Sequence, residues 1–405
     1  MAYLVVFVVI LCCLTNRVSS KLKLKLPEER MNATEIIRFH GYPAEEHLVV
    51  TADGYILGIQ RIPYGLKSNG TKTRRAPILL QHGLLTSSVN WISNLPSQSL
   101  GFILADEGYD VWLGNIRGNV YSQKHIMHTK YNRKFWNFSW QEMAEFDLPA
   151  MIDYILNTTR YQQLYYVGHS QGTLIGFALF SSNKHYASKV RTFFALAPVA
   201  TVGHIQSPAR LLAPFTGIIK RMLDFIGDYS TGDVTWVLDI VRPTCHLRTG
   251  FLDLCENLMF FFTGPQKIAH LNQTRVPIYF AHNPAGTSMK NIAHFGQMVN
   301  SGRMQKYNYG LLGNLRKYNH VWPPVYNVKL MKTPTLLFWS SMDALADYRD
   351  VGLLLPKIKR KIAFKIAQYS HIDFLWSLDA NRRVYEKIRV ALHLCEKGKC
   401  DIPGG

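Results

Sequence analysis

Short apolar segments that end near a glycine alternate with helix-like segments through the first half of the chain. The apolar segments cover residues 76–81, 109–113 and 164–167, and a glycine follows each of them within two residues. Residues 142–156 carry apolar side chains at roughly helical spacing. Strands that are apolar along their whole length and are connected through helices are typical of a buried parallel sheet. The alternation predicts an α/β fold with a mostly parallel central sheet and helices on both faces.

The alternation stops near residue 200 and returns near residue 328. Residues 335–340 and 362–367 are again short apolar runs, whereas residues 201–327 show aromatic clusters without a strand pattern. This middle stretch predicts a mainly helical insertion in the fold. The expected organisation is an α/β core (21–200), an inserted cap or lid (201–327), and a second part of the core with a C-terminal tail (328–405).

Residues 1–20 predict a secretory signal peptide. Residues 3–14 form an apolar run that is too short to span a bilayer comfortably, and the small Ser19 and Ser20 follow it. No Lys or Arg precedes the run, so a retained signal anchor is the alternative. We expect a secreted protein, extracellular or in the gut lumen, or a lysosomal one.

Four cysteines follow this segment, an even number that fits disulfide bonds in an oxidising compartment. Of the three possible pairings, the local one is favoured, which joins Cys245 to Cys255 and Cys395 to Cys400. Their spacing does not match a zinc site, and no metal is expected. Five Asn-x-Ser/Thr triplets are candidate glycosylation sites: Asn32, Asn69, Asn137, Asn157 and Asn272.

The chain is strongly basic, with a formal net charge of +19. Residues 257–342 contribute nine Lys or Arg and no Asp or Glu. Such charge suits nucleic acid, polyanions or anionic lipid, but a secretory signal argues against nucleic acid. Peripheral contact with an anionic lipid surface is one interpretation of this stretch, and a solvated basic face is the other. No segment indicates an oligomer.

The pentapeptide at residues 168–172, GHSQG, matches G-x-S-x-G. It follows a predicted strand and opens a predicted helix, which is the context of a nucleophile elbow. In that turn the glycines permit a strained backbone, and the hydroxyl of Ser170 projects at the carboxyl edge of the sheet. A glycine-rich turn with a capping serine is the alternative.

A serine nucleophile needs a histidine base held by a carboxylate. If the acid follows the resumed strand and precedes the histidine, only His371 and His393 remain as bases. His371 lies just past a strand and is favoured, whereas His393 lies inside the final helix. Asp343 is the first carboxylate after residue 256 and is the favoured acid, with Asp347 as the alternative.

Acyl transfer also requires fixed N–H donors for the oxyanion of the tetrahedral intermediate. One donor is expected from Gln171, the residue after the nucleophile, at the start of a helix. The second is expected from the loop after residues 76–81, where Leu84 is the chosen residue. In the same loop, His82 is interpreted as a side chain that braces the backbone.

Longer motifs in the chain resemble those of the acid lipases, the animal group of gastric and lysosomal lipases in the α/β-hydrolase superfamily. The resemblance extends over residues 35–386. Among the motifs that carry it are HGYPAEEHLVVTADGYILGIQRIPYG (40–65), QHGLLTSSVNW (81–91), GNIRGNVYS (114–122), GHSQG (168–172), NPAGTSMKN (283–291) and HIDFLW (371–376).

The resemblance implies an α/β-hydrolase fold with a cap over the site, and hydrolysis of neutral lipid esters without metal or organic cofactor. It matches Ser170, Asp343 and His371 to the family's triad, and Leu84 and Gln171 to its oxyanion positions. We therefore expect a serine lipase acting on triacylglycerols or sterol esters at a lipid–water interface. An esterase for smaller soluble or hormone-like esters is the alternative, and a non-catalytic lipid carrier is a further one.

Overall fold

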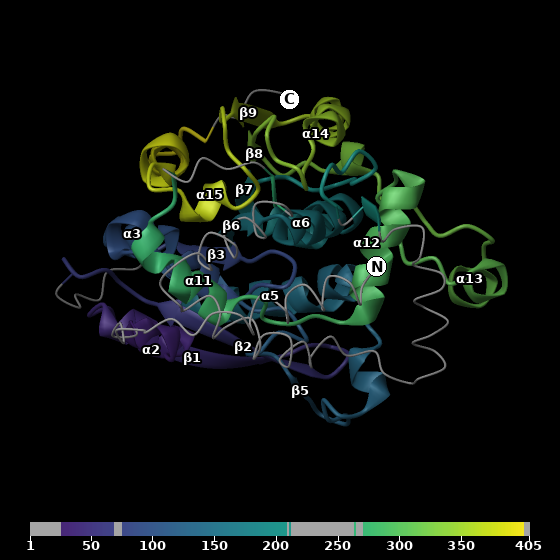
Figure 1. Cartoon of the computed structure of the whole chain (residues 1–405), viewed down its shortest axis with the longest axis horizontal. Coiled ribbons are helices and arrows are strands. Elements are labelled where there is room, and N and C mark those ends of the chain that lie inside the picture. Colours follow the sequence, from purple (N-terminus) through teal and green to yellow (C-terminus); the bar gives the residue numbers. More distant parts are fainter. Residues whose placement is uncertain (1–25, 69–74, 209, 212–262, 265–269, 401–405) are drawn as a thin grey trace, which may run out of the picture.

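A nine-stranded sheet forms the centre of the molecule in the computed structural model, which describes residues 26–68, 75–208, 210–211, 263–264 and 270–400. The strands follow the order β1-β2-β4-β3-β6-β7-β8-β9, and β5 pairs with β2. In Figure 1 the labels of β1, β2, β3, β6, β7, β8 and β9 rise in this order toward the top, and the label of β5 lies below them. The strands are β1 (Glu45–Val50), β2 (Tyr55–Ile62), β3 (Pro77–Gln81), β4 (Asp110–Gly114), β5 (Lys124–His125), β6 (Leu164–His169), β7 (Val190–Leu196), β8 (Thr335–Trp339) and β9 (Lys361–Lys365).

The sheet is parallel from β4 to β9 and antiparallel at its other edge. All neighbouring pairs from β4–β3 to β8–β9 are parallel, whereas β2 runs antiparallel to β1, β4 and β5. The predicted mostly parallel α/β sheet is confirmed. The two-residue strand β5 has no apolar run, which is why the sequence pattern did not reveal it.

The middle of the sheet is the core of the protein. Every residue of β3, β4 and β6 is buried, as expected for strands with helices over both faces. Parallel strands all present their carboxyl ends at one edge, so loops that leave β3, β6 and β8 meet there. The candidate site residues lie in these loops.

The helices of the core lie before, between and after the parallel strands. The predicted helix over 142–156 contains a π-helical turn (Met143–Asp147) between α4 (Trp140–Glu142) and α5 (Leu148–Thr159). The final helix likewise begins with a π-helical turn (Asn381–Tyr385) before α16 (Glu386–Glu396). The other core helices are α2 (Ala33–Phe39), α3 (Leu100–Asp106), α6 (Gln171–Ser182), α7 (Lys184–Ser188), α14 (Tyr348–Leu354) and α15 (Asp373–Trp376).

The described residues between 270 and 327 comprise helices joined by loops, and they contribute no strand to the sheet. These helices are α11 (Val276–His282), α12 (Met289–Ser301) and α13 (Leu311–Tyr318). In Figure 1, α13 projects at one end of the long axis. Cys245 and Cys255 lie outside the described residues, so their pairing and the limits of the cap (201–327) stay predictions.

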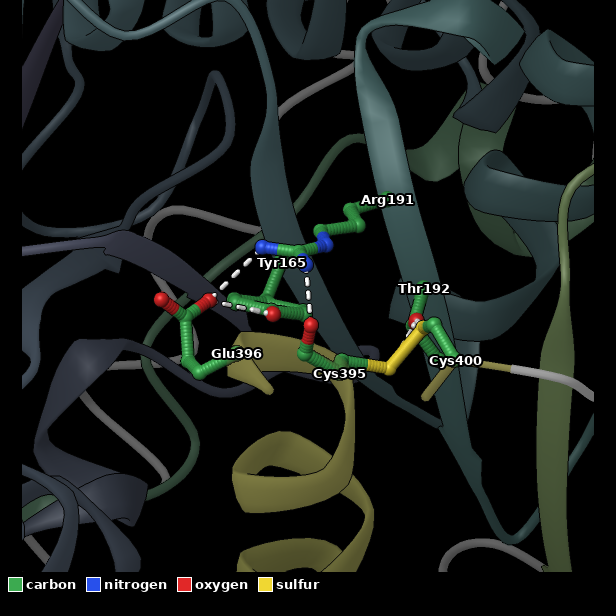
Figure 2. The surroundings of a disulfide bond; sticks show 6 residues. All are labelled: Tyr165, Arg191, Thr192, Cys395, Glu396 and Cys400. Carbon is green, nitrogen blue, oxygen red and sulfur yellow. Dashed lines mark hydrogen bonds and ion pairs between the residues drawn. A yellow bond between two sulfur atoms is a disulfide. The ribbon is translucent and has the colours of Figure 1, made fainter. Parts of the chain in front are cut away.

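A disulfide bond links the C-terminal tail to α16, and a polar cluster packs this end of the chain against the sheet (Figure 2). The disulfide joins Cys395, at the end of α16, to Cys400, which is the local pairing expected for the tail. The Oγ1 atom of Thr192 in β7 lies 3.4 Å from the Sγ atom of Cys400. The carboxylate of Glu396 accepts hydrogen bonds from Tyr165 in β6 at 2.6 Å and from Arg191 in β7 at 2.8 Å.

The candidate glycosylation sites differ in exposure. The side chains of Asn32, Asn137 and Asn157 are exposed, and Asn272 is half-buried. Asn69 lies outside the described residues, as do residues 1–20, the predicted signal peptide. Among the described residues, no helix has the length and apolar character needed to cross a membrane.

Candidate active site

Ser170 occupies a sharp turn between β6 and α6. Strand β6 ends at His169, helix α6 begins at Gln171, and Ser170 between them has φ 53° and ψ −118°. A positive φ is strained for a residue with a Cβ atom and costs roughly 1–3 kcal/mol. The backbone N–H of Ser170 donates to the carbonyl of Leu196 at 3.1 Å, and the Thr173 N–H donates to the Ser170 carbonyl at 2.8 Å. These bonds hold the strained turn in place.

Glycine is required on both sides of this turn. A Cβ atom on Gly172 would lie 2.4 Å from the carbonyl oxygen of Gln81, at the end of β3. A Cβ atom on Gly168 would lie 2.7 Å from the carbonyl carbon of Gly172. Any side chain at either position would push the helix away from the sheet. The two glycines of G-x-S-x-G therefore set the close approach that brings Ser170 to the sheet edge.

His371 and Asp343 form a buried pair at the same edge. Both carboxylate oxygens of Asp343 lie 2.9 Å from Nδ1 of His371. Because a carboxylate only accepts, Nδ1 carries the proton and Nε2 is available to a second partner. Oδ1 of Asp343 also accepts from the backbone N–H groups of Leu345 at 2.9 Å and Ala346 at 2.8 Å. The loop after β8 thus fixes the carboxylate toward the imidazole.

The alternative acid and base lie elsewhere. Asp347 is the N-cap of α14: its Oδ1 accepts from the Arg349 N–H at 2.8 Å and its Oδ2 from Gln206. His393 lies within α16, one turn before its end. The structure therefore brings Asp343, and not Asp347, into contact with His371.

His169 connects the serine turn to the histidine loop. Its Nε2 atom donates to the backbone carbonyl of His371 at 2.9 Å, and the two rings lie 5.0 Å apart. Burial, with a smaller contribution from His371, lowers the pKa of His169 to about 3 and keeps the ring neutral. Sequence reasoning missed this residue because the second position of G-x-S-x-G imposes no residue type.

His82 braces the loop that carries Leu84. Its Nδ1 donates to the carbonyl of Gly83 at 2.8 Å, and its Nε2 accepts from the Ile116 N–H at 3.3 Å and from Asn119 at 3.0 Å. This is the role that sequence analysis favoured for His82. The loop lies against the serine turn, because a Cβ atom on Gly83 would be 3.1 Å from the Cβ atom of Ser170.

The buried His82 is expected to make the protein less stable in acid. Burial lowers its pKa to about 4, and donors already occupy Nε2. In the unfolded chain the pKa is about 6.5, so the unfolded state binds more protons below that pH and the folded state loses stability. From pH 7 to pH 5, His82 alone should lower the free energy of unfolding by about 2 kcal/mol, at about 1.36 kcal/mol per pKa unit.

NMR of the labelled histidine ring checks this prediction. The His82 resonance, assigned by its loss in His82→Gln, should stay that of a neutral ring at pH 5 and titrate near pH 4. Urea titrations at pH 7, 6 and 5 should show the free energy of unfolding decreasing with pH. A titration midpoint near pH 6.5 would contradict the hydrogen-bond assignment at Nε2.

One segment, residues 283–291, contacts both loops expected to supply oxyanion donors. The Ala285 N–H donates to the carbonyl of Leu85 at 2.6 Å, next to Leu84. The same segment also reaches Gln171 directly, because Nδ2 of Asn291 donates to Oε1 of Gln171 at 2.7 Å. Asn291 is fully buried. The NPAGTSMKN motif thus fixes the spacing between the two loops.

A second buried polar cluster lies nearby and is fully paired. The guanidinium of Arg117 donates to Asp147 at 2.7 Å and to Asp53 at 2.6 and 2.8 Å. Arg117 joins the π-helical turn before α5 to the turn between β1 and β2, and we assign this cluster a structural role. Within the described part of the chain, no group of three or more His, Cys, Asp or Glu is placed to hold a metal ion.

A serine on a strained strand-to-helix turn and a buried histidine–carboxylate pair, both at the same edge of a parallel sheet, define the class of α/β hydrolases. The family model described as alpha/beta hydrolase fold matches residues 76–378. The model described as partial alpha/beta-hydrolase lipase region matches residues 33–95. The chain belongs to the lipase family of α/β hydrolases, and it is a carboxylic ester hydrolase.

Curated relatives cover nearly the whole chain. Gastric triacylglycerol lipase of Mus musculus is 46% identical over 91% of this chain and 93% of its own length. Lysosomal acid lipase/cholesteryl ester hydrolase of Homo sapiens is 44% identical over 89% of this chain and 90% of its own length. The crystal structure of an alpha/beta hydrolase from Penicillium shares the fold, with a TM-score of 0.53, 13% identity, and coverage of 87% of this chain and 99% of that one.

Proposed function

We propose that this protein is a serine lipase that cleaves carboxyl esters of neutral lipids, triacylglycerols or sterol esters, through an acyl-enzyme. The observation that carries the proposal is the strained Ser170 turn at the sheet edge that also holds the buried His371–Asp343 pair. The substrate class is supported by the relatives, one named for triacylglycerols and one also for cholesteryl esters.

In the first half of the reaction, Oγ of Ser170 attacks the ester carbonyl carbon. Nε2 of His371 takes the hydroxyl proton as the new C–O bond forms, and Asp343 stabilises the imidazolium through Nδ1. The tetrahedral intermediate then collapses. The bond to the alcohol oxygen breaks, and His371 gives its proton to that oxygen, which leaves as the glyceride or sterol alcohol.

In the second half, water replaces the alcohol and releases the acid. Nε2 of His371 takes a proton from water while the water oxygen attacks the acyl carbon. The second tetrahedral intermediate collapses, Ser170 regains its proton from His371, and the fatty acid leaves. The protein ends in its starting state.

Two backbone N–H groups are proposed to stabilise both intermediates. The amide of Gln171 lies in the first turn of α6, where the N–H groups have no acceptor within the helix and the helix dipole favours negative charge. The amide of Leu84 lies in the loop that packs against Ser170. One such donor contributes about 2.7–4 kcal/mol to the stability of the transition state.

The setting of the enzyme is also a proposal. The segment 1–20 would direct the chain to secretion or the lysosome, and the Cys395–Cys400 disulfide fits an oxidising compartment. Asn32, Asn137 and Asn157 are exposed and so accessible to glycosylation. The basic residues of 257–342 would favour an anionic lipid surface.

Comparison of three substrates tests the proposal. The purified glycoprotein is given emulsified triolein, emulsified cholesteryl oleate and a soluble short-chain ester at pH 5 and pH 8. Fatty acid release from either emulsion supports the lipase, and the preferred ester and pH identify its substrate and compartment. Cleavage of the soluble ester alone would favour an esterase for small esters, and no cleavage of any ester would contradict catalysis.

Replacing Asn291 with aspartate should slow catalysis without preventing folding. The aspartate can still accept from the Trp140 N–H, as Asn291 does at 2.8 Å, but it loses the donor to Gln171 and places a carboxylate beside that side chain. We expect kcat on the soluble ester to fall about 10- to 100-fold, with little change in KM. This loss is smaller than the roughly 10²–10³-fold decrease in kcat that follows deletion of an oxyanion donor, because Asn291 acts through Gln171.

Asn314→Asp is the matched control for this variant. Asn314 is also buried, and its side chain also donates and accepts hydrogen bonds, from α13 rather than from the site. The control should lower thermal stability comparably and leave kcat within about twofold of the parent value. Equal kcat values in the two variants would show that Asn291 acts on stability alone.

A further inference from the structure

Helix α13 and the loop after it expose a group of large apolar side chains. The helix buries only Asn314, while Leu312 is 66% exposed and Trp322 in the loop is 69% exposed. An isolated exposed apolar residue is common, but a contiguous group marks an interaction surface. We call this group the α13 patch: Leu311, Leu312, Leu315, Val321, Trp322 and Val325.

The α13 patch is built on a fixed backbone. Nδ2 of Asn314 donates to the carbonyl of Val321 at 2.9 Å, and its Oδ1 accepts from the Tyr309 N–H at 2.9 Å. The hydroxyl of Tyr318 donates to the carbonyl of Tyr307 at 2.9 Å. One buried asparagine thereby holds the helix and the loop together, and both carry exposed apolar side chains.

Positive charge accompanies the apolar side chains. Arg316 and Lys317 lie in the last turn of α13, Lys329 lies in the following segment, and all three are exposed. None of them forms an ion pair with a described residue, in contrast to Lys306, which pairs with Glu145 at 2.7 Å. No acidic residue occurs between 257 and 342, so nothing in this segment offsets the charge.

We propose that the α13 patch docks the enzyme on an anionic lipid surface. Apolar side chains with an aromatic ring and flanking cations are the combination by which peripheral helices insert at the headgroup boundary. The proposal rests on the proposed lipase function and adds to it a dedicated attachment site. Helix α15 begins two residues after His371 and so marks the histidine loop. In Figure 1, α13 and α15 lie toward opposite ends of the long axis. The patch is therefore separate from the histidine loop.

Sedimentation with lipid vesicles tests the docking surface. The protein carries Ser170→Ala, so that lipid is not consumed, and the vesicles contain phosphatidylcholine with or without phosphatidylglycerol. The parent should bind the anionic vesicles more tightly. Leu312→Ser with Trp322→Ser should weaken this binding about tenfold or more, because both side chains leave the headgroup boundary.

Two further variants separate docking from folding. Phe39→Ser with Leu48→Ser removes side chains of comparable exposure, 50% and 57%, on α2 and β1, and should bind as the parent does. Arg316→Gln with Lys317→Gln changes only exposed side chains and should weaken binding to anionic vesicles more than to neutral ones. With Ser170 restored, the patch variants should lose activity on emulsified triolein and keep it on a soluble ester.

Three outcomes would overturn the proposal. Unchanged vesicle binding by both patch variants would exclude the lipid surface. A parent dimer that the Leu312→Ser, Trp322→Ser variant dissociates, with vesicle binding unaltered, would assign the patch to a second copy. A lower thermal midpoint of the Leu312→Ser, Trp322→Ser variant, with unaltered vesicle binding, would show that the α13 patch serves packing within the chain. Vesicle binding is measured without hydrolysis, so failure of the proposed function would appear separately, as absent ester cleavage.

Discussion

Ser170→Ala is expected to lower kcat for ester hydrolysis by about 10⁶-fold, the size of effect seen when a catalytic serine is removed from a triad. The variant keeps the backbone of the turn, because the hydrogen bonds that hold Ser170 come from main-chain atoms and from Thr173. The thermal midpoint should therefore stay close to that of the parent. Hydrolysis of emulsified triolein and of a soluble ester, with circular dichroism for folding, checks both expectations.

Ser182→Ala is the control for this variant. Ser182 lies at the end of the same helix, and its hydroxyl donates to the carbonyl of Ala178 at 2.7 Å. It makes no contact with His371 or Asp343, so activity should be unchanged. Substantial turnover in folded Ser170→Ala would assign the chemistry to another residue.

Asp343→Asn should lower kcat by about 10⁴-fold. Asparagine has the same shape and can still accept from the Leu345 and Ala346 N–H groups. Its amide would compete with Nδ1 of His371 as a donor, favour the wrong tautomer, and leave the imidazolium without a negative partner. Steady-state kinetics on a soluble ester above pH 7 measures the loss without an interfacial step.

Asp347→Asn makes the same chemical change four residues away. Asparagine caps helices as well as aspartate does, so α14 should persist and kcat should stay within about twofold of the parent value. If Asp347→Asn lost activity and Asp343→Asn did not, the acid would be Asp347 despite the contact seen between Asp343 and His371.

The fold could be predicted largely from local patterns. Apolar runs followed by glycine placed the central strands to within one or two residues, because strands buried on both faces carry no polar positions. The π-helical turns at Met143–Asp147 and Asn381–Tyr385 were not predictable, since they depend on packing between helices and leave the apolar spacing nearly unchanged. The strand β5 depends only on backbone pairing with β2.

The candidate site was predictable where its chemistry demands particular residue types. A nucleophilic serine requires glycine neighbours, and an acid-free stretch left few choices for the carboxylate. Asn291 was not predictable in the same way, because it lies 120 residues from Gln171 and an amide can serve many structural roles. His169 and the α13 patch likewise required the structure, which alone shows what each side chain contacts or leaves exposed.

Reaction with diethyl p-nitrophenyl phosphate tests the central claim, that Ser170 is the activated nucleophile, most directly. Attack of Oγ on phosphorus displaces p-nitrophenolate and leaves a diethylphosphoryl group on the serine. We predict release of one equivalent of p-nitrophenolate, loss of triolein hydrolysis in parallel, and the added mass on the peptide that contains Ser170. Inactivation with the label on another residue, or full hydrolytic activity after Ser170 is labelled, would contradict the account.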